Sequence, residues 1–538
     1  MSRKEKIVIG TLVVAAAAIH LFLLGKYAVN LPFKDDYRVF VNYLYYFFNS
    51  GEGLSLIFLP DNESHPVLMR LITLLQYTLD GQLDFRHILW FCNLFLLLIL
   101  VTLSAHFYRR KEYWNIAFVF LLVLNTMHHE LYFRTDVVTY QTLSFSLSLF
   151  LFYGAVYYNS LGRWIRALFY IAFILTPFGS VNGMLANGLV VVYFLVNREN
   201  RNALVTTAVL LALEILFIVV FLSGDGKSLS VWENIRKYNF ELVYAYFLAM
   251  GGVMNVISNP TTWTLLVGVS AVIFGYTFYR LFFPFQWRLD FEKLLFIFCA
   301  GSLALIVILR YNYWMAGYVS VLESRYKIYG TLIILLFFSV LVRRFSRIRP
   351  LVGLFLLGLF AAGVYKGTGM LKIQHTDQWV KAYNVDQDIY EQGYARDLYI
   401  SKERKEKLEE QGIYSFEPVR KMAGRILVEK NRLKEISGVS IGNAETDPLS
   451  KGDWSKNVYP IQRLEADGVF PYKKYYFIRF RAKEGKSSLH PMGPPPHSVL
   501  KGLPPETVQE LSMDFYPQVL TGVDFKEYEV YGTDDLGL

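Results

Sequence analysis

Long apolar runs fill the first two thirds of the chain and constrain its fold more than any other feature. About 20 apolar residues are enough for one helix to cross a bilayer. Only 18% of the 538 residues are charged and the mean hydropathy is +0.31, whereas soluble domains carry about 25% charged residues. We therefore expect an all-α polytopic membrane bundle with about eleven spans. These spans are 7–29, 85–108, 113–128, 136–158, 163–178, 182–197, 202–222, 260–283, 291–311, 325–343 and 350–366.

Basic residues cluster at the ends of these runs. With the spans above, every cluster falls on the same side, which the positive-inside rule makes cytoplasmic. The net charge of +9 is thus explained by topology and does not indicate nucleic-acid binding. The N-terminus is then inside, and everything after residue 367 is outside. The clusters are Arg3-Lys4-Lys6, Arg109-Arg110-Lys111, Arg163 with Arg166, Arg198 with Arg201, Arg280 with Arg288 and Lys293, and Arg343-Arg344-Arg347-Arg349.

The first run resembles a signal peptide, because "MSRKEK" precedes an apolar stretch, but no cleavage motif of small residues closes it. We interpret it as an uncleaved first span. The two cysteines, Cys92 and Cys299, both lie inside apolar runs. They indicate neither a disulfide framework nor a cysteine-based metal site.

Two further segments are predicted to be helices that do not cross the membrane. Residues 63–79 have apolar positions at helical spacing with Arg70, Thr73 and Gln76 between them. Counting this segment as a span would move every later basic cluster to the wrong side, so we expect a helix on the outer membrane surface. Residues 239–258 receive the same interpretation, as a second surface or re-entrant segment.

The composition changes after Lys366. Residues 371–538 are polar, with the strand-like "KKYYFIRFRA", the helical "SKERKEKLEEQG" and a proline-rich loop, "HPMGPPPHSVLKGLPPE". We therefore predict two domains, a transmembrane domain at 1–366 and a soluble mixed α/β domain at 367–538. A segment of roughly 170 residues is large enough for its own core. Its expected role is structural or in docking an acceptor.

Charged residues gather on the predicted outer side, where the first loop reads "LPFKDDYRVF". Charges at span ends are costly unless they face water, a partner or a ligand. Carboxylates beside several cations suit a nucleophile-activating base next to an anion-binding pocket. The candidate catalytic residues are Asp35 and Asp36, of which one would be the base and the other would fix the loop, with a slight preference for Asp36 as the base. The candidate substrate-binding residues are Arg38, Glu63, His65, Arg70, His128, His129, Glu130, Arg134, Arg310, Arg325, Tyr326 and Lys327.

Each candidate has a simpler interpretation. The two aspartates also suit a solvated loop, and Arg310 and Arg325 suit side chains that reach out to the interface. The pair His128-His129 is more typical of a polar helix end than of a metal site, because it lacks the i, i+4 histidine spacing. Tyr311, Tyr313 and Trp314 are more typical of an aromatic belt than of a sugar platform.

This arrangement resembles the GT-C superfamily of membrane glycosyltransferases, which includes protein mannosyltransferases and the lipid A aminoarabinose transferase. The similarity covers residues 1 to about 366: a first span, an outer loop with "DDYR", the surface helix "NESHPVLMRLITLLQYTL" and the following span. Arg310 followed by "SRY" at 324–326 is similar to bacterial membrane proteins of this architecture. A WWDYG-like motif of oligosaccharyltransferases and a protein mannosyltransferase signature are both missing from the sequence.

The resemblance implies an inverting enzyme of the bacterial inner membrane. It would take a sugar from a polyprenyl-phosphate carrier and transfer it to a hydroxyl of a glycan, lipid or protein. It implies one or two carboxylates as base and cations for the phosphate, with no certain cofactor and a divalent cation left open. The alternatives are a flippase or transporter of lipid-linked sugars, for which Glu214 is the main intramembrane candidate, and a polysaccharide polymerase or ligase.

Overall fold

The computed structural model describes most of the apolar part and selected elements of the remainder. The described residues are 2–33, 35–59, 66–197, 200–221, 231–255, 260–283, 288–310, 322–386, 402–421, 439–441, 462–471, 475–482, 487–492, 507–515 and 523–533.

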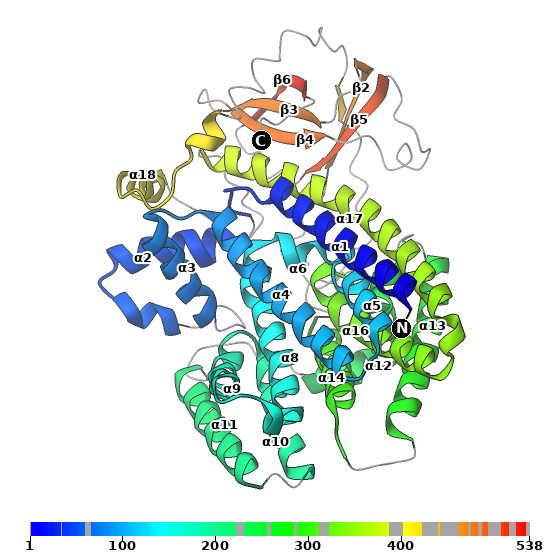
Figure 1. Ribbon diagram of the computed structural model, residues 1–538. Coiled ribbons are helices and arrows are strands. Elements are labelled where there is room, and N and C mark those ends of the chain that lie inside the picture. The colour runs from blue at the N-terminus through cyan, green and yellow to red at the C-terminus, as the bar shows by residue number, and fades with distance from the viewer. Residues whose placement is uncertain are drawn as a thin grey trace. The chain divides into compact units, whose positions relative to one another are not determined.

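A helix occurs in each of the eleven ranges predicted to cross the membrane (Figure 1). These helices are α1 (Arg3–Tyr27), α4 (Phe85–Arg109), α5 (Tyr113–Val123), α8 (Leu143–Val156), α9 (Arg163–Leu175), α10 (Val181–Val196), α11 (Asn200–Phe221), α13 (Pro260–Phe282), α14 (Phe291–Arg310), α16 (Lys327–Arg344) and α17 (Arg349–Asp386).

Seven helical stretches in the described part of the chain are long and apolar enough to span a bilayer. They are Arg3–Tyr27, Phe85–Arg109, Thr135–Val156, Thr261–Phe282, Phe291–Arg310, Ser324–Arg344 and Ser346–His375. The bent pair Tyr113–Val123 and Thr126–Phe133, with 46° between its halves, would make an eighth. The apolar parts of α10 and α11 are shorter, so the count of eleven crossings stays a prediction.

Local sequence explains how several of these helices begin and pack. α1 starts with a capping box, in which Ser2 Oγ accepts the Glu5 N–H at 3.2 Å and Glu5 Oε2 accepts the Ser2 N–H at 2.7 Å. Two glycines allow close contact between backbones. A Cβ at Gly330 would lie 2.1 Å from the Met250 carbonyl oxygen, and one at Gly367 would lie 2.4 Å from that of Thr126.

The predicted surface helix is α3 (Val67–Asp80). Its 14 residues span about 21 Å, which is too short to cross the hydrocarbon core. Leu71, Leu75 and Leu79 are exposed on one face, while Leu68 and Ile72 are buried on the other. An exposed apolar stripe suits a helix lying in a membrane surface. The second such segment is α12 (Val231–Met250), which is broken at Tyr238 and followed by the 3-10 turn η7 (Gly252–Met254).

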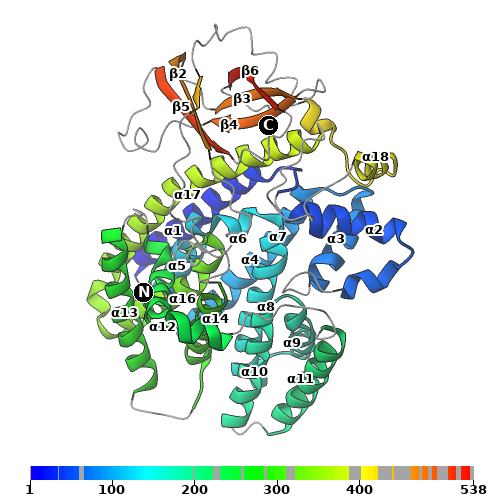
Figure 2. The same cartoon turned by 180° about the vertical axis from the view of Figure 1, so that it is seen from behind.

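The chain divides into two compact units. The first contains residues 1–29, 50–76 and 85–371. In it, α4 packs on α5 and α8, α8 on α10, and α14 on α12 and α16 (Figures 1 and 2). The second contains residues 30–49, 77–84 and 372–538. The predicted domain boundary at 366/367 falls inside the continuous helix α17.

The described C-terminal elements are one helix and six strands. The helix is α18 (Lys402–Glu410). One antiparallel sheet has the order β1 (Val439–Ile441), β2 (Gln462–Pro471), β5 (Thr507–Phe515). The other has the order β4 (Ser487–Met492), β3 (Tyr475–Ala482), β6 (Val523–Thr533), with Ile478 opposite both His490 and Val530. β3 covers most of the strand-like stretch "KKYYFIRFRA".

Candidate functional site

Two segments almost 200 residues apart meet in the first unit. The earlier contains η3 (Thr126–His128), α6 (His129–Phe133) and α7 (Thr135–Val137); the later is the 3-10 turn η8 (Ser324–Tyr326). The Glu130 N–H donates to Ser324 Oγ at 2.9 Å, and this hydroxyl donates to Glu130 Oε2 at 3.1 Å. The structure therefore brings together two of the segments from which the sequence supplied candidates.

Arg134 is committed to internal ion pairs. Its Nε and Nη2 bind both oxygens of Asp136 at 2.8 and 2.6 Å, and its Nη1 donates to Glu130 Oε1 at 3.2 Å. The guanidinium is nearly completely buried. A bidentate pair of this kind fixes geometry. Arg134 thus holds the carboxylate of Glu130 in place.

Arg325 and Arg310 lie close to this pair of segments. Arg325 Nε donates to Glu323 Oε2 at 2.6 Å, and its guanidinium stacks 5.0 Å from the centre of the Tyr326 ring. The charges of Arg134 and Glu130 act on Arg325, and the charge of Arg310 acts on Tyr326. Arg310 is the last residue of α14. Several candidate cations therefore share one region.

Lys327 has the most unusual environment of these residues. It is only 8% exposed, yet its ammonium has no hydrogen-bond or ion-pair partner in the part of the chain that the structure describes. The charges acting on it are those of Lys366 and Glu130. A lysine with so little exposure to solvent is costly when its ammonium has no bonded partner. This site would gain stability by binding an anion.

Lys366 is a cation that sequence reasoning missed as a site residue. Its Nζ donates to the Asn255 carbonyl oxygen at 2.9 Å, directly after η7. A Cβ at Gly252 in η7 would lie 3.0 Å from Lys327 Cγ, so a small residue makes room for the lysine stem. The sequence signal that could have identified Lys366 is a lysine at the end of the otherwise apolar run 350–366. We call Glu130, Arg310, Arg325, Lys327 and Lys366 the Lys327 cluster.

Two other candidates in the first unit, His128 and Arg70, are bonded to groups of the protein itself. His128 is completely buried, with Nε2 3.3 Å from both the Leu122 carbonyl oxygen and Thr331 Oγ1. Arg70 Nη1 donates to the carbonyls of Leu56 at 2.8 Å, Ile57 at 3.2 Å and Leu59, and so closes the 3-10 turn η2 (Gly53–Phe58). His129 is partly exposed. Glu63 and His65 lie outside the described residues.

The two aspartates, which belong to the second unit, have opposite environments. Asp36 is completely buried, and its Oδ2 accepts the Phe33 N–H at 2.9 Å. Asp35 is 43% exposed and pairs with Arg38 at 3.4 Å. The π-helix η1 (Tyr37–Asn42) follows directly. Asp36 thus fixes the turn, whereas Asp35 is accessible to a reactant. Groups of three or more metal-ligating side chains are not found among the described residues.

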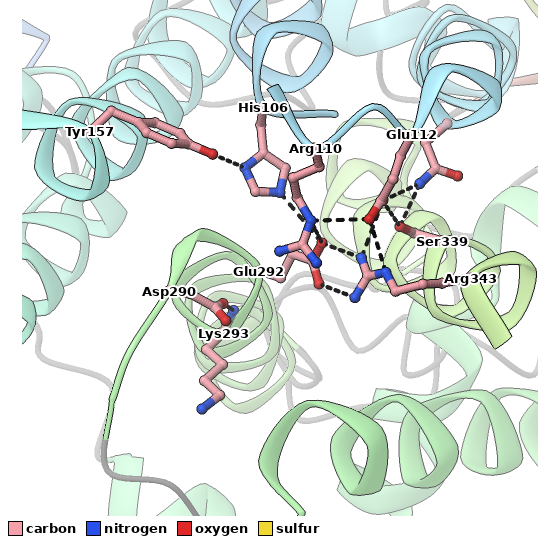
Figure 3. Close-up of polar contacts among 10 residues, drawn as sticks. His106, Arg110, Glu112, Tyr157, Asp290, Glu292, Lys293, Ser339 and Arg343 are labelled. Carbon is pink, nitrogen blue, oxygen red and sulfur yellow. Dashed lines mark hydrogen bonds and ion pairs between the residues drawn. The ribbon is translucent and has the colours of Figure 1, made fainter. Parts of the chain in front are cut away.

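A second polar cluster, which the sequence did not predict, joins four helix ends in the first unit (Figure 3). The Glu292 carboxylate of α14 accepts a hydrogen bond from Arg343 Nη2 of α16 at 2.6 Å. The same carboxylate lies 3.4 Å from His106 Nε2 of α4. Glu112, just before α5, accepts Arg343 Nε at 3.0 Å and Arg110 Nε at 3.1 Å. We call these residues the Glu292 cluster. The sequence signal that could have predicted this cluster is a single acidic residue, Glu112 or Glu292, at the start of each of two apolar runs.

His106 connects this cluster to a further helix end. Its Nδ1 lies 3.1 Å from the Tyr157 hydroxyl, and its Nε2 faces Glu292. In the same cluster the guanidinium groups of Arg343 and Arg110 pair with the carboxylates of Glu292 and Glu112. Each of these four charged groups therefore has an oppositely charged partner, whereas Lys327 has no ion-pair partner among the described residues.

Comparisons with protein-family models, with curated proteins and with solved structures found no significant match for this chain.

Proposed function

We propose that this protein is a membrane glycosyltransferase that moves a sugar from a polyprenyl-phosphate carrier to an acceptor hydroxyl. The observation that carries the proposal is Lys327, a residue only 8% exposed whose ammonium has no hydrogen-bond or ion-pair partner among the described residues and on which the charge of Lys366 also acts. A carrier phosphate is an anion whose lipid tail stays in the bilayer. The membrane-length helices of the first unit suit such a substrate.

The Lys327 cluster has the composition that a phosphate leaving group requires. Arginine forks bind phosphate oxygens in pairs, and lysine adds a point charge. When the bond between the anomeric carbon and the phosphate oxygen breaks, the oxygen keeps the electron pair. Preplaced cations stabilise this charge. The phosphate is already a weak base, so the leaving group needs no general acid.

The reaction also needs a base for the acceptor. We assign this role to Asp35, because it is the exposed carboxylate of the pair, and a supporting role to Asp36. Asp35 would take the proton of the acceptor hydroxyl as its oxygen attacks the anomeric carbon. Attack opposite the leaving phosphate inverts the configuration. The acceptor is a hydroxyl of a glycan, lipid or protein.

The proposal includes the finer architecture expected from the sequence. The chain would cross the membrane eleven times, with its N-terminus in the cytoplasm of a bacterial cell. Residues 367–538 would form an extracytoplasmic mixed α/β domain. Positively charged loops are retained inside during insertion, which is the reason for this orientation.

The experiment is a transfer assay with purified protein in liposomes. Polyprenyl phosphates that carry different radiolabelled sugars are supplied one at a time, with a mixed acceptor fraction from bacterial envelopes. We expect label to move from one donor into the acceptor fraction, and binding of unglycosylated polyprenyl phosphate in a separate assay. Absence of both transfer and polyprenyl-phosphate binding in folded protein would refute the proposed function.

A further inference from the structure

The loop with Asp35 and Asp36 is part of the same compact unit as residues 402–421. Contacts are made with the residue before the loop and with helix α2 (Tyr43–Asn49), which follows η1. The Tyr414 hydroxyl donates to the Asn30 carbonyl oxygen at 3.1 Å. Asn49 and Gln411 exchange amide hydrogen bonds of 3.1 and 2.9 Å. The guanidinium of Arg404 lies 5.0 Å from the centre of the Tyr46 ring.

A second short stretch of the unit is held by the same segment. The Leu83 N–H donates to the Ile413 carbonyl oxygen at 2.8 Å. Asn30, Asn49 and Leu83 thus all bond to residues 411–414, although more than 300 residues separate them in sequence. The contacts therefore hold the residue directly before the aspartate loop, Asn30, and the end of the helix that follows η1, Asn49.

Residues 402–421 are themselves well braced. α18 ends at Glu410, and Gly412 follows with a φ of +66°, which favours glycine; the Ile413 N–H then donates to the Leu408 carbonyl oxygen at 2.8 Å. Glu409 Oε1 accepts the Phe416 N–H at 2.9 Å, and both Glu409 oxygens accept Arg420 Nη2 at 3.0 and 2.8 Å. The segment can therefore serve as a fixed support for the loop.

Tyr414 is at the centre of this arrangement. Its ring is almost completely buried and packs edge-on against Phe416 at 4.9 Å. Burial raises the pKa of the Tyr414 phenol, and the nearby Tyr37, Asp84 and Asp36 add to the effect. The hydroxyl is thus a permanent donor. It bonds to the backbone six residues before Asp36 and lies within electrostatic reach of that carboxylate.

We propose that residues 402–421 position the catalytic loop, and that Tyr414 is a positioning residue for Asp35. The C-terminal part of the chain would then be required for the chemical step, in addition to any role in acceptor docking. The inference rests on the proposed function, in which Asp35 is the base. A misplacement of about 1 Å at a reacting group can cost 10²-fold in rate, so a modest shift of the loop is measurable.

The test uses the full chain with Tyr414→Phe, which removes only the hydroxyl. We expect kcat of sugar transfer to fall roughly 10-fold or more with the donor KM unchanged, since the loop and not the donor site is disturbed. Hydrogen exchange of backbone amides in residues 30–49 should become faster. The control is Tyr170→Phe, which removes a hydroxyl bonded to Tyr158 at 3.0 Å and should change neither quantity.

A second variant covers the case in which Tyr414→Phe does not fold. Gln411→Ala removes an exposed amide pair with Asn49 and should give a smaller effect of the same sign. Wild-type kcat together with unchanged exchange in residues 30–49 would overturn the positioning role. If the wild-type protein transfers no sugar but Tyr414→Phe still accelerates exchange in residues 30–49, the support of the loop stands and the proposed function fails.

Discussion

Arg343 of α16 donates a hydrogen bond of 2.6 Å to Glu292 of α14, from a position 51 residues further along the chain. Glu292 is 2% exposed and Arg343 is 35% exposed. The pair joins the ends of two neighbouring helices, and the same arginine also reaches Glu112 before α5. A residue expected only to define topology is therefore also part of an interior ion-pair network.

Glu292→Ala should destabilise the protein strongly. Removing one partner of a buried ion pair costs about 3–5 kcal/mol, and the exposure of Arg343 places this site at the lower end. We expect the melting temperature in detergent micelles to fall by several degrees. The control is Glu417→Ala, which removes an exposed pair with Lys421 at 2.8 Å and should leave the melting temperature unchanged. Equal melting temperatures for the two variants would assign the Glu292 cluster no stabilising role.

Lys327→Met should have opposite effects on stability and binding. Methionine keeps the apolar stem but removes a charge that has no bonded partner, so the melting temperature without ligand should rise. A charged hydrogen bond to phosphate contributes about 1.5–3 kcal/mol, so polyprenyl-phosphate binding should weaken roughly 10- to 100-fold. The exposed Lys26→Met is the matched control and should change neither value. Unchanged affinity in folded Lys327→Met would remove Lys327 from the phosphate site.

The two aspartates should respond differently to substitution. Asp35→Asn keeps the shape of the side chain but loses its basicity, so transfer should fall at least 10²-fold while donor binding persists. Asp36→Ala removes the acceptor of the Phe33 N–H and should mainly lower the melting temperature. If Asp35→Asn and Asp36→Asn are both folded and transfer sugar at wild-type rates, "DDYR" is a solvated loop.

Arg70→Met should reduce stability without affecting the donor. It leaves the carbonyls of Leu56 and Ile57 without their guanidinium donor, which costs about 1–3 kcal/mol for buried groups. A lower melting temperature with unchanged polyprenyl-phosphate affinity is the expected result. Weaker affinity at an unchanged melting temperature would return Arg70 to the substrate-binding residues predicted from the sequence.

Reporter fusions test the predicted orientation. The positive-inside rule predicts that the basic clusters are cytoplasmic, so alkaline phosphatase fused after Leu538 should be active in a bacterial host. Green fluorescent protein at the same point should not fluoresce. A fluorescent, phosphatase-inactive pattern would contradict both the eleven-span topology and an outer location of the C-terminal residues.

The positions of the helices were predictable because their signal is local. Apolar runs with charged ends predicted a helix in each of eleven ranges, and helical spacing over a short length predicted α3. The same pattern drew attention to the segments around Glu130 and Arg325. It gave only a slight preference for Asp36 as the base, because adjacent residues of one type carry the same local information, and the structure instead buries Asp36 and exposes Asp35.

Only the tertiary structure decided which polar groups meet. Glu130 and Ser324 are 194 residues apart, and the partners of Glu292 come from other helices. Packing also separated residues that the sequence had grouped: it committed Arg70 to backbone carbonyls and buried Asp36, while it left the Lys327 ammonium without a hydrogen-bond or ion-pair partner among the described residues. The physical reason is that hydrophobic period and length act over a few neighbouring residues, whereas the free energy of a buried charge depends on whatever the folded chain places beside it.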